Sequence, residues 1–467
     1  MAKKKLSSST SGPSLVSIDI HDMAFPNDYG VGKAAGYVLF VPGALPQDRI
    51  KAEIVKRGKH FGYARMVSLE QPSPLRIKPP CPHFGLCGGC TLQNIGYQHQ
   101  LLMKERYLHE TLKRVGDIDA TKVDVLPICP SPLTYSYRSK IELSFGEEQG
   151  QAVLGLRQRL SPFEKYDGSV IPLHGCMNFS ATLTRIIPVF TDYARSHRLA
   201  CYNMLTRRGT LRRLIVREAK ASGDIMVILE ATTGRLPDTS GLWQAMIKTA
   251  PEIKSFFCAV NRRTGDSTRF EQILHVGGHV FIEEKVDPWI FRVHPESFFQ
   301  PNPKSAETLY RQIPSMAPLS RDETMLGLYC GMGPIEISLS PFVKTVTGID
   351  SLPQNIANAV ENSLINNRSN CTFLTGAVER LHVTGSITRP DITVVDPPRG
   401  GLTPAACNLI ATLKPRKLIY ISCNPSTLAR DLKLFIAKGY TIGKIAPFDF
   451  FPHTSHSETF VYLQDHL

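Results

Sequence analysis

A cysteine close to the carboxyl end of the chain stands between two acidic residues in a pattern that could support covalent chemistry. Cys423 follows an apolar run, Asp396 precedes it in an Asp-Pro-Pro-Arg segment, and Glu458 comes after it. A thiolate can add to an electron-poor carbon, and a carboxylate can take up a proton that must leave later. These residue types favour group transfer to a ring carbon that cannot attack by itself, with Cys423 as nucleophile and Glu458 as general base.

Uracil C5 is a carbon of this kind. If a thiolate adds to C6, C5 gains enolate character and can accept a methyl group from a sulfonium, after which a base removes the C5 proton. Because an ordinary thiol is little ionised at neutral pH, we expect a positive or hydrogen-bonding surrounding for Cys423. The alternative for Cys423 is a buried cysteine at a strand end. His453 and His456 are rival bases that we interpret as positioning or structural residues.

A glycine-containing turn follows an expected strand at 324–329. Gly331 and Gly333 lie in this turn, and Asp350 closes the next expected strand. An acidic side chain at that place can accept hydrogen bonds from the ribose hydroxyls of a nucleoside cofactor. The turn lacks the Lys-Ser/Thr pair of a phosphate-binding P-loop. Together these features indicate a nucleoside cofactor.

The elements that must hold these residues alternate between strands and helices. The expected strands are 324–329, 343–348, 371–374, 392–395 and 417–421, with an antiparallel edge hairpin at 441–447 and 459–463. This alternation predicts a doubly wound α/β sheet that binds ligands at the carboxyl ends of its strands.

Composition changes along the chain predict four segments. We expect a disordered basic tail at 1–13, a small β-barrel at 14–75, a cysteine segment followed by a central α+β domain at 76–297, and the α/β domain at 298–467. Small barrels with basic and aromatic residues often bind nucleic acid. A solvated barrel surface is the alternative.

Five arginines surround Gly209 in the central segment and could contact a phosphate backbone. They are Arg207, Arg208, Arg212, Arg213 and Arg217. The alternative is that they form the solvated face of a hairpin. We favour RNA contact because the rest of the chain points the same way.

Three cysteines lie close together in Cys81-Pro-His-Phe-Gly-Leu-Cys87-Gly-Gly-Cys90. Closely spaced thiolates flanked by glycines can bind one soft centre, either an iron–sulfur cluster or zinc. Cys176 is the candidate fourth ligand and Cys129 its rival. A disulfide is less favoured, since the chain is long and its cysteines are sparse.

The charge balance favours a polyanionic partner. The 467 residues include 54 Lys and Arg against 41 Asp and Glu, a net charge of +13. Neutralising phosphates releases counterions, so RNA is the expected partner. No apolar run approaches the roughly 18 residues that a membrane span needs. We therefore expect a cytoplasmic protein, without a membrane contact or an obligate protein partner.

These motifs resemble those of the RNA (uracil-5-)-methyltransferase family, and within it the TRAM-domain 23S rRNA (uracil-5-)-methyltransferases that carry a 4Fe-4S cluster. The resemblance runs from roughly Val16 to Leu463 and rests on CPHFGLCGGC, FFQPN, LYCGMG, DPPR, SCNPSTLARDL and FPHTSHSE. It implies a Rossmann-like α/β methyltransferase domain dependent on S-adenosylmethionine, an N-terminal OB-like β-barrel (TRAM) that binds RNA, and a central α+β domain.

The resemblance also implies roles for individual residues. It implies cofactor contacts from Gln300, Tyr329, Asp350 and Asp396, a nucleophile at Cys423, a proton acceptor at Glu458, and cluster ligands at Cys81, Cys87, Cys90 and Cys176. The implied activity is methyl transfer to C5 of a uridine, with 23S rRNA favoured over tRNA.

The chain departs from the family pattern near the cofactor turn. Gly327 stands where the family usually has aspartate, Pro334 and Ala377 occupy places that often hold polar residues, and Asp350 replaces the commoner glutamate. The alternatives are a tRNA uridine-C5 methyltransferase, an RNA cytosine-C5 methyltransferase, and an RNA-binding factor of the same fold without activity. A radical methylthiotransferase would need a CxxxCxxC segment, which differs from the spacing here.

Overall fold

The computed structural model describes residues 15–265, 269–381 and 389–465, so the expected tail at 1–13 lies outside it. The chain forms two compact units. The first comprises residues up to Gln100 together with Gln158–Asp167 and His453–Ser455, and the second comprises Leu101–Arg157, Gly168–Pro452 and the residues from His456.

The first unit contains a closed five-stranded barrel with the order β1-β2-β3-β5-β4. Its strands are β1 (Leu15–Ala24), β2 (Tyr29–Ala34), β3 (Tyr37–Pro42), β4 (Arg49–Arg57) and β5 (Phe61–Gln71). Ile18, Leu39 and Ile50 are among the aliphatic residues buried inside it. A Cβ at position 32 would come within 2.3 Å of the Ile18 side chain, so glycine there allows β1 and β2 to pack closely.

The second unit begins with most of a long helix and a seven-stranded sheet of order β12-β11-β10-β9-β6-β7-β8. These elements are α1 (Tyr97–Gly116), β6 (Lys140–Glu148), β7 (Gln151–Arg157), β8 (Val170–Pro172), α2 (Thr182–Ser196), β9 (Leu211–Glu218), β10 (Ile225–Ala231), α3 (Thr239–Thr249), β11 (Ile253–Val260) and β12 (Gln272–Gly278). A two-stranded hairpin follows, made of β13 (Ile282–Val286) and β14 (Trp289–Val293).

A second seven-stranded sheet occupies the carboxyl-terminal part of this unit, with the order β17-β16-β15-β18-β19-β21-β20. Its elements are α4 (Pro303–Met316), β15 (Thr324–Leu328), α5 (Pro334–Leu339), β16 (Thr345–Asp350), α6 (Pro353–Ile365), β17 (Cys371–Thr375), β18 (Ile392–Val395), α7 (Pro404–Leu413), β19 (Lys417–Ser422), α8 (Pro425–Ala437), β20 (Tyr440–Phe448) and β21 (Glu458–Asp465). The first five strands of this order are parallel to one another, and β21 and β20 are antiparallel to their neighbours.

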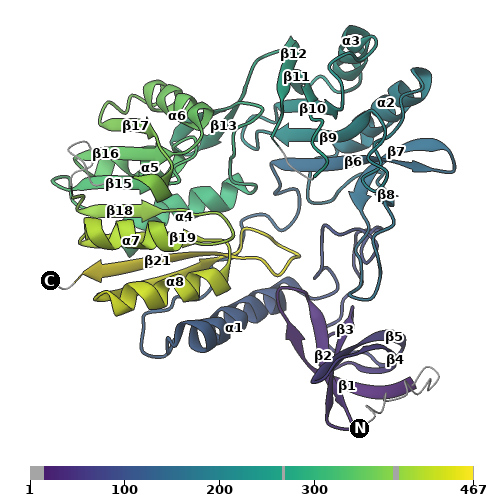
Figure 1. Ribbon diagram of the computed structural model, residues 1–467, viewed down its shortest axis with the longest axis horizontal. Helices are drawn as coiled ribbons and strands as arrows, with labels where there is room; N and C mark the ends of the chain where they lie inside the picture. The colour runs from purple at the N-terminus through teal and green to yellow at the C-terminus, as the bar shows by residue number, and fades with distance from the viewer. Residues whose placement is uncertain (1–14, 266–268, 382–388, 466–467) are drawn as a thin grey trace, which may run out of the picture. The chain divides into compact units, whose positions relative to one another are not determined.

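Helices cover both faces of this sheet, as an α/β sheet requires. Helices α4, α5 and α6 pack on one face through residues such as Ile313, Ile337 and Ala359. Helices α7 and α8 lie together on the other face, with Leu413 and Leu432 buried there (Figure 1). The strand order reverses between β15 and β18, which is where a doubly wound sheet opens a crevice for ligands. The expected α/β class with an N-terminal barrel is confirmed.

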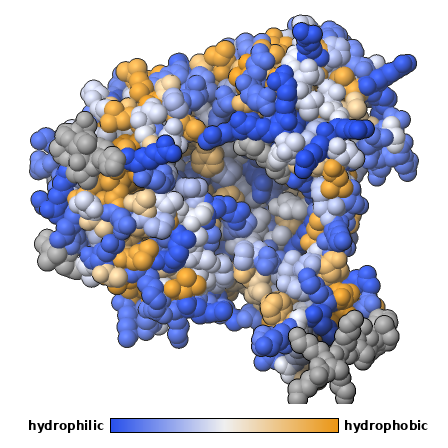
Figure 2. All heavy atoms as spheres, viewed as in Figure 1, coloured by the Kyte–Doolittle hydropathy of each residue, from blue (hydrophilic) through white to orange (hydrophobic). Residues whose placement is uncertain are grey.

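None of the helices among the described residues has the length and apolar character needed to cross a membrane. The face of the molecule in Figure 2 is mostly hydrophilic, and its hydrophobic residues form small scattered groups.

Candidate active site

A cavity of about 560 Å³ lies in the second unit, at the carboxyl ends of β15, β18 and β19. This volume is in the range of small-molecule sites. The residues that line it come from the segment 298–301, the glycine turn and the start of α5, the end of β16 and the following α6, the Asp-Pro-Pro-Arg segment, the residue after β19, and the chain around the start of β21. They are Phe298, Phe299, Gln300, Pro301, Tyr329, Cys330, Gly331, Met332, Pro334, Ile335, Glu336, Asp350, Asn355, Val394, Asp396, Pro397, Pro398, Arg399, Cys423, Phe451, His456 and Glu458.

The turn after β15 uses unusual backbone angles that glycine accommodates. Gly331 and Gly333 have φ of 56° and 81°, and Tyr329 has φ of 62°. The Tyr329 hydroxyl donates a hydrogen bond to Glu379 Oε1 at 2.9 Å. A Cβ at position 333 would lie 2.9 Å from the Phe373 ring, so this turn also packs too closely for a larger residue.

Asp350 holds the same turn from the end of β16. Its carboxylate accepts hydrogen bonds from Gly331 N at 3.1 Å, Leu352 N at 2.9 Å and Asn355 Nδ2 at 3.0 Å. Because an ionised carboxylate has about four lone-pair sites, it retains the capacity for a further hydrogen bond. The structure thus places Asp350, the predicted nucleoside contact, at the cavity wall, and these three hydrogen bonds hold its carboxylate in position.

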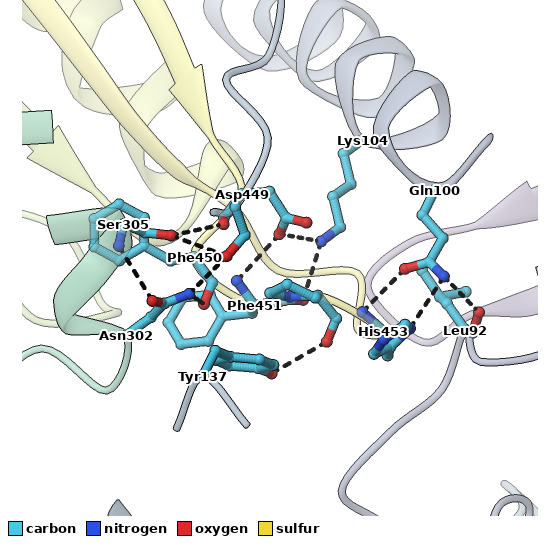
Figure 3. A network of polar contacts seen from close by, with 12 residues as sticks. Leu92, Gln100, Lys104, Tyr137, Asn302, Ser305, Asp449, Phe450, Phe451 and His453 are labelled. Atoms are coloured by element: carbon cyan, nitrogen blue, oxygen red, sulfur yellow. Dashed lines mark hydrogen bonds and ion pairs between the residues drawn. The ribbon is translucent and has the colours of Figure 1, made fainter. Parts of the chain in front are cut away.

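Gln300 and Asp396 face the cavity from two other segments. Gln300 Nε2 lies 3.3 Å from Asp396 Oδ2, and Gln300 is buried. Asn302 then begins α4, since its side-chain oxygen accepts a hydrogen bond from Ser305 N at 3.1 Å. Asn302 Nδ2 also donates to Phe450 O at 3.1 Å (Figure 3). The FFQPN segment is therefore anchored to the residues that precede β21.

Cys423 follows β19 and is partly buried at the cavity wall. Asn424 accepts a hydrogen bond from Ser426 N at 3.1 Å and so caps α8 directly after the thiol. Burial, followed by the negative charges of Glu458 and Asp396, raises the pKa of Cys423 to about 12, and Arg399 opposes this rise. The expected lowering of the thiol pKa is therefore not found in this structure, because burial and the two carboxyl groups outweigh Arg399 and a backbone hydrogen bond.

Glu458 and Asp396 form an acidic pair beside this thiol. Glu458 begins β21 and is 2% exposed. Burial, and then the charge of Asp396, holds the pKa of Glu458 well above its ordinary value, and burial raises the pKa of Asp396 to about 7. Two neighbouring carboxyl groups in a desolvated wall resist double ionisation. The pair can therefore retain a proton near neutral pH.

The two histidines of the FPHTSHSE segment differ in position. His456 lines the cavity, and its Nδ1 lies 3.2 Å from an Arg399 guanidinium nitrogen. Burial, and then the charge of Arg399, lowers the pKa of His456 to about 4, so its ring is neutral at physiological pH. His453 belongs to the first unit and is not among the residues that line the cavity, and its backbone N donates to Gln100 Oε1 at 2.9 Å.

Sequence reasoning missed three residues that shape this site. Glu336 and Phe451 line the cavity, and Lys104 reaches from α1 to Asp449 and to Phe451 O (Figure 3). The sequence signal for Glu336 was the glycine at position 327 in place of an aspartate, and the signal for Lys104 was its place in an amphipathic helix. Neither signal reveals which distant segment the side chain meets.

The arginines around Gly209 divide into two groups. Arg207 and Arg208 are exposed, whereas Arg212, Arg213 and Arg217 are buried. The interpretation of all five as phosphate contacts is therefore wrong.

The three buried arginines have structural partners instead. Arg213 pairs with Glu230, the Arg212 guanidinium lies 4.2 Å from the centre of the Tyr202 ring, and Arg217 donates to Ser297 O at 2.6 Å. Burial lowers the pKa of Arg217 to about 10. The hairpin made by β9 and β10 is almost fully buried, so the alternative of a solvated hairpin face is wrong as well.

The cysteines predicted to bind a metal form no disulfide and are all of intermediate exposure. Cys81, Cys87 and Cys90 lie in the first unit and Cys176 in the second. Gly89 N donates to Cys87 Sγ at 3.3 Å. In the described part of the chain, no three His, Cys, Asp or Glu side chains are grouped so that they could hold a metal ion. Cys129, the rival ligand, forms an isolated backbone bridge with Phe448, and burial raises the pKa of its thiol.

The chain is similar to known RNA methyltransferases over almost its whole length. A family model described as tRNA (uracil-5-)-methyltransferase matches residues 266–466. An uncharacterized RNA methyltransferase of Halalkalibacterium halodurans is 34% identical over 96% of this chain and 97% of its own. An uncharacterized RNA methyltransferase of Listeria innocua is 33% identical over 95% of this chain and 96% of its own.

A solved structure of an RNA methyltransferase is also similar to this chain in three dimensions. It is the Pyrococcus abyssi tRNA (uracil-54, C5)-methyltransferase in complex with S-adenosyl-L-homocysteine, which matches with a TM-score of 0.75 and 29% identity over 96% of this chain and all of that one. The barrel, the α/β sheet and these relatives agree, and the chain belongs to the RNA (uracil-5-)-methyltransferase family of S-adenosylmethionine-dependent enzymes.

Proposed function

We propose that the protein methylates C5 of a specific uridine in RNA through a transient bond between Cys423 Sγ and C6 of the uracil. The observation that carries this proposal is that one cavity is lined by Cys423, Glu458 and Asp396 together with the nucleoside-binding candidates Asp350 and Gln300. The reaction requires a nucleophile, a general base and residues that bind the cofactor within one cavity.

Bound S-adenosylmethionine would supply an electrophilic methyl group. We propose that Asp350 accepts a hydrogen bond from a ribose hydroxyl, and that Gln300, Tyr329 and Asp396 complete the contacts to the cofactor. Residues Gln300 and Asp396 support this assignment, because they face each other across 3.3 Å at the cavity wall. The cavity volume of about 560 Å³ and the polar groups that line the cavity fit a cofactor of the size of S-adenosylmethionine.

The protein's own residues would carry out the remaining steps. The Cys423 thiolate forms the bond to C6, which places electron density on C5 and the uracil O4. After C5 has gained its methyl group, the Glu458 carboxylate takes the C5 proton. The bond between Cys423 Sγ and C6 then breaks, which restores the C5–C6 double bond and the thiolate. The raised pKa of Glu458 supports its role, since it makes the ionised carboxylate a stronger base.

RNA containing 5-fluorouridine tests this proposal. Fluorine at C5 cannot leave as a proton, so the methylated adduct should persist as a covalent complex of protein and RNA. Mass spectrometry of the digested complex should locate the RNA on the peptide that contains Cys423. Cys423→Ala should form no complex, and an adduct of normal yield in that variant would overturn the role of Cys423.

We propose 23S rRNA as the substrate, on the resemblance of the barrel and the cysteine segment to rRNA enzymes. Transfer RNA is the second candidate, favoured by the likeness to the Pyrococcus abyssi tRNA enzyme over 96% of the chain. Mapping 5-methyluridine in rRNA and tRNA from a deletion strain, with and without the restored gene, decides between them. If neither RNA changes and the pure protein incorporates no methyl group, the protein is an RNA-binding factor of this fold.

We propose that residues 14–75 form the RNA-binding barrel, 76–297 the cysteine segment and central domain, and 298–467 the catalytic domain. An aromatic cluster on the barrel supports the first assignment. The rings of Phe40 and Phe61 are 5.4 Å apart, Tyr63 lies 5.9 Å from Phe61, and Lys56 Nζ lies 5.8 Å from the Tyr63 ring. Exposed aromatic rings beside cations can stack on bases and contact phosphates. The lack of a disulfide among the described cysteines and the net charge of +13 fit a cytoplasmic protein that binds RNA.

We also propose that Cys81, Cys87, Cys90 and Cys176 bind a 4Fe-4S cluster. The support is the soft donor set, the absence of a disulfide among the cysteines of the described residues, and the hydrogen bond from Gly89 N to Cys87 Sγ. Iron and acid-labile sulfide should be found after anaerobic purification and should be lost in Cys87→Ser. One zinc per chain without iron would contradict the cluster.

A further inference from the structure

Glu336 is a buried carboxyl group with one oxygen that has no protein partner. It belongs to α5, is 2% exposed, and lines the same cavity as Cys423 and Asp350. Its Oε2 has no hydrogen-bond partner among the described residues. An unpaired buried carboxyl group destabilises a folded protein, so its presence beside a ligand cavity calls for a partner that the protein itself does not supply.

The neighbouring strand leaves space for this side chain. A Cβ at position 327 of β15 would lie 2.1 Å from Glu336 Oε1. Any side chain larger than hydrogen at that position would therefore displace the carboxyl group. Gly327 is thus required by Glu336, in addition to any role in the strand.

The carboxyl groups around the cavity favour a cationic ligand, which would stabilise their ionised forms. Its described lining residues include four carboxyl groups, those of Glu336, Asp350, Asp396 and Glu458, and one guanidinium, that of Arg399. Burial, and then the charges of Asp396 and Asp350, raises the pKa of Glu336 to about 8. A cationic ligand group near Glu336 would lower this pKa and stabilise the ionised carboxylate.

We propose that Glu336 is a cofactor-binding residue whose carboxylate pairs with a cationic group of the methyl donor. This inference rests on the proposed use of S-adenosylmethionine in this cavity. The donor carries two such groups, its sulfonium and the ammonium of its amino-acid part, whereas S-adenosylhomocysteine carries the ammonium alone and 5′-methylthioadenosine carries neither. Calorimetric binding of these three compounds to the full-length protein separates the possibilities.

Glu336→Gln keeps the shape of the side chain and removes its charge. We expect it to weaken the binding of S-adenosylmethionine by about tenfold to a hundredfold, the range for a lost charged hydrogen bond. The affinity for 5′-methylthioadenosine should stay within about twofold of the wild-type value. An equal loss for S-adenosylhomocysteine identifies the ammonium as the partner, and an unchanged affinity for it identifies the sulfonium. Unchanged binding of all three compounds, or an equal loss for all three, would overturn the proposal.

Two further variants separate a ligand contact from a structural role. Gly327→Ala should displace the carboxyl group and reproduce the loss of donor affinity, with little additional loss when combined with Glu336→Gln. Glu361→Gln, on α6 and outside the cavity lining, should leave all three affinities unchanged. A wild-type protein that binds none of the three compounds would instead contradict the use of this cofactor.

The unliganded protein provides a readout without activity. Glu336→Gln should melt at or above the temperature of the wild type, because an amide replaces an unpaired buried carboxyl group. A lower melting temperature together with unchanged donor binding would assign Glu336 a purely structural role.

Discussion

Lys104 Nζ lies 2.6 Å from Asp449 Oδ1, and both side chains are fully buried. Lys104 also donates to Phe451 O at 3.1 Å, and Phe451 N donates to Asp449 Oδ1 at 3.1 Å. The pair therefore fixes the chain just before Phe451, which lines the cavity. A lysine on α1 thus positions a wall of the site without lying in it.

Lys104→Met should destabilise the protein by about 3–5 kcal/mol, because it leaves the Asp449 carboxylate buried without its cation. Chemical denaturation measures this change. Arg106→Ala, which removes an exposed ion pair with Glu110 on the same helix, should change stability by less than about 1 kcal/mol. Similar losses of stability in both variants would show that the buried ion pair stabilises the protein no more than the exposed one.

Glu458→Gln should stop the reaction after methyl transfer. The amide cannot accept the C5 proton, so a methylated adduct between Cys423 and natural uridine-containing RNA should accumulate while turnover falls by at least about a hundredfold. Intact-mass analysis of the protein–RNA complex detects the added methyl group. Turnover close to that of the wild type would assign the proton transfer to another group.

Alkylation of Cys423 should respond to pH as expected for a thiol with a raised pKa. With a pKa of about 12, the thiolate fraction below that pH rises about tenfold per pH unit, whereas an ordinary thiol levels off above about pH 8.5. We expect the rate of iodoacetamide labelling, followed on the Cys423 peptide by mass spectrometry, to rise without a plateau up to pH 10. A plateau near pH 8 would show that the free protein activates this thiol.

Arg399 provides the matched test, because its positive charge opposes the rise in the pKa of Cys423. Arg399→Gln should slow labelling at every pH in this range, and Arg399→Lys should restore part of the rate. Equal rates in the three proteins would mean that the guanidinium is too solvated to influence the thiol.

Phe61→Ala should weaken RNA binding by the barrel. Phe61 is 45% exposed on β5 and contacts two other rings, and loss of one base–aromatic stack is worth about 1–3 kcal/mol, or roughly fivefold to a hundredfold in affinity. Fluorescence anisotropy with unmodified RNA measures the change. Val67→Ala, which alters another exposed residue of β5, is the control, and equal effects of the two would exclude stacking.

The local pattern of the sequence was enough to predict the α/β sheet, whereas the role of Cys423 as nucleophile stays a prediction. The expected strand at 392–395 coincides with β18, whereas the strand expected at 343–348 formed as β16 at Thr345–Asp350. Strand β2 was not predicted, because Tyr29–Ala34 contains small and charged residues whose burial depends on the barrel closing around them. The hairpin expected at 441–447 and 459–463 formed as β20 and β21, each slightly longer than predicted.

The sequence by itself determined which groups could react, because the thiol, the late carboxylate and the glycine turn can be recognised from residue types and their order along the chain. Only the tertiary structure decided their surroundings: it buried Arg213 against Glu230, joined Lys104 to Asp449 across 345 positions, and set Glu336 opposite Gly327. Burial and charge pairing arise from contacts between distant segments, and a pKa follows from those contacts rather than from the residue type.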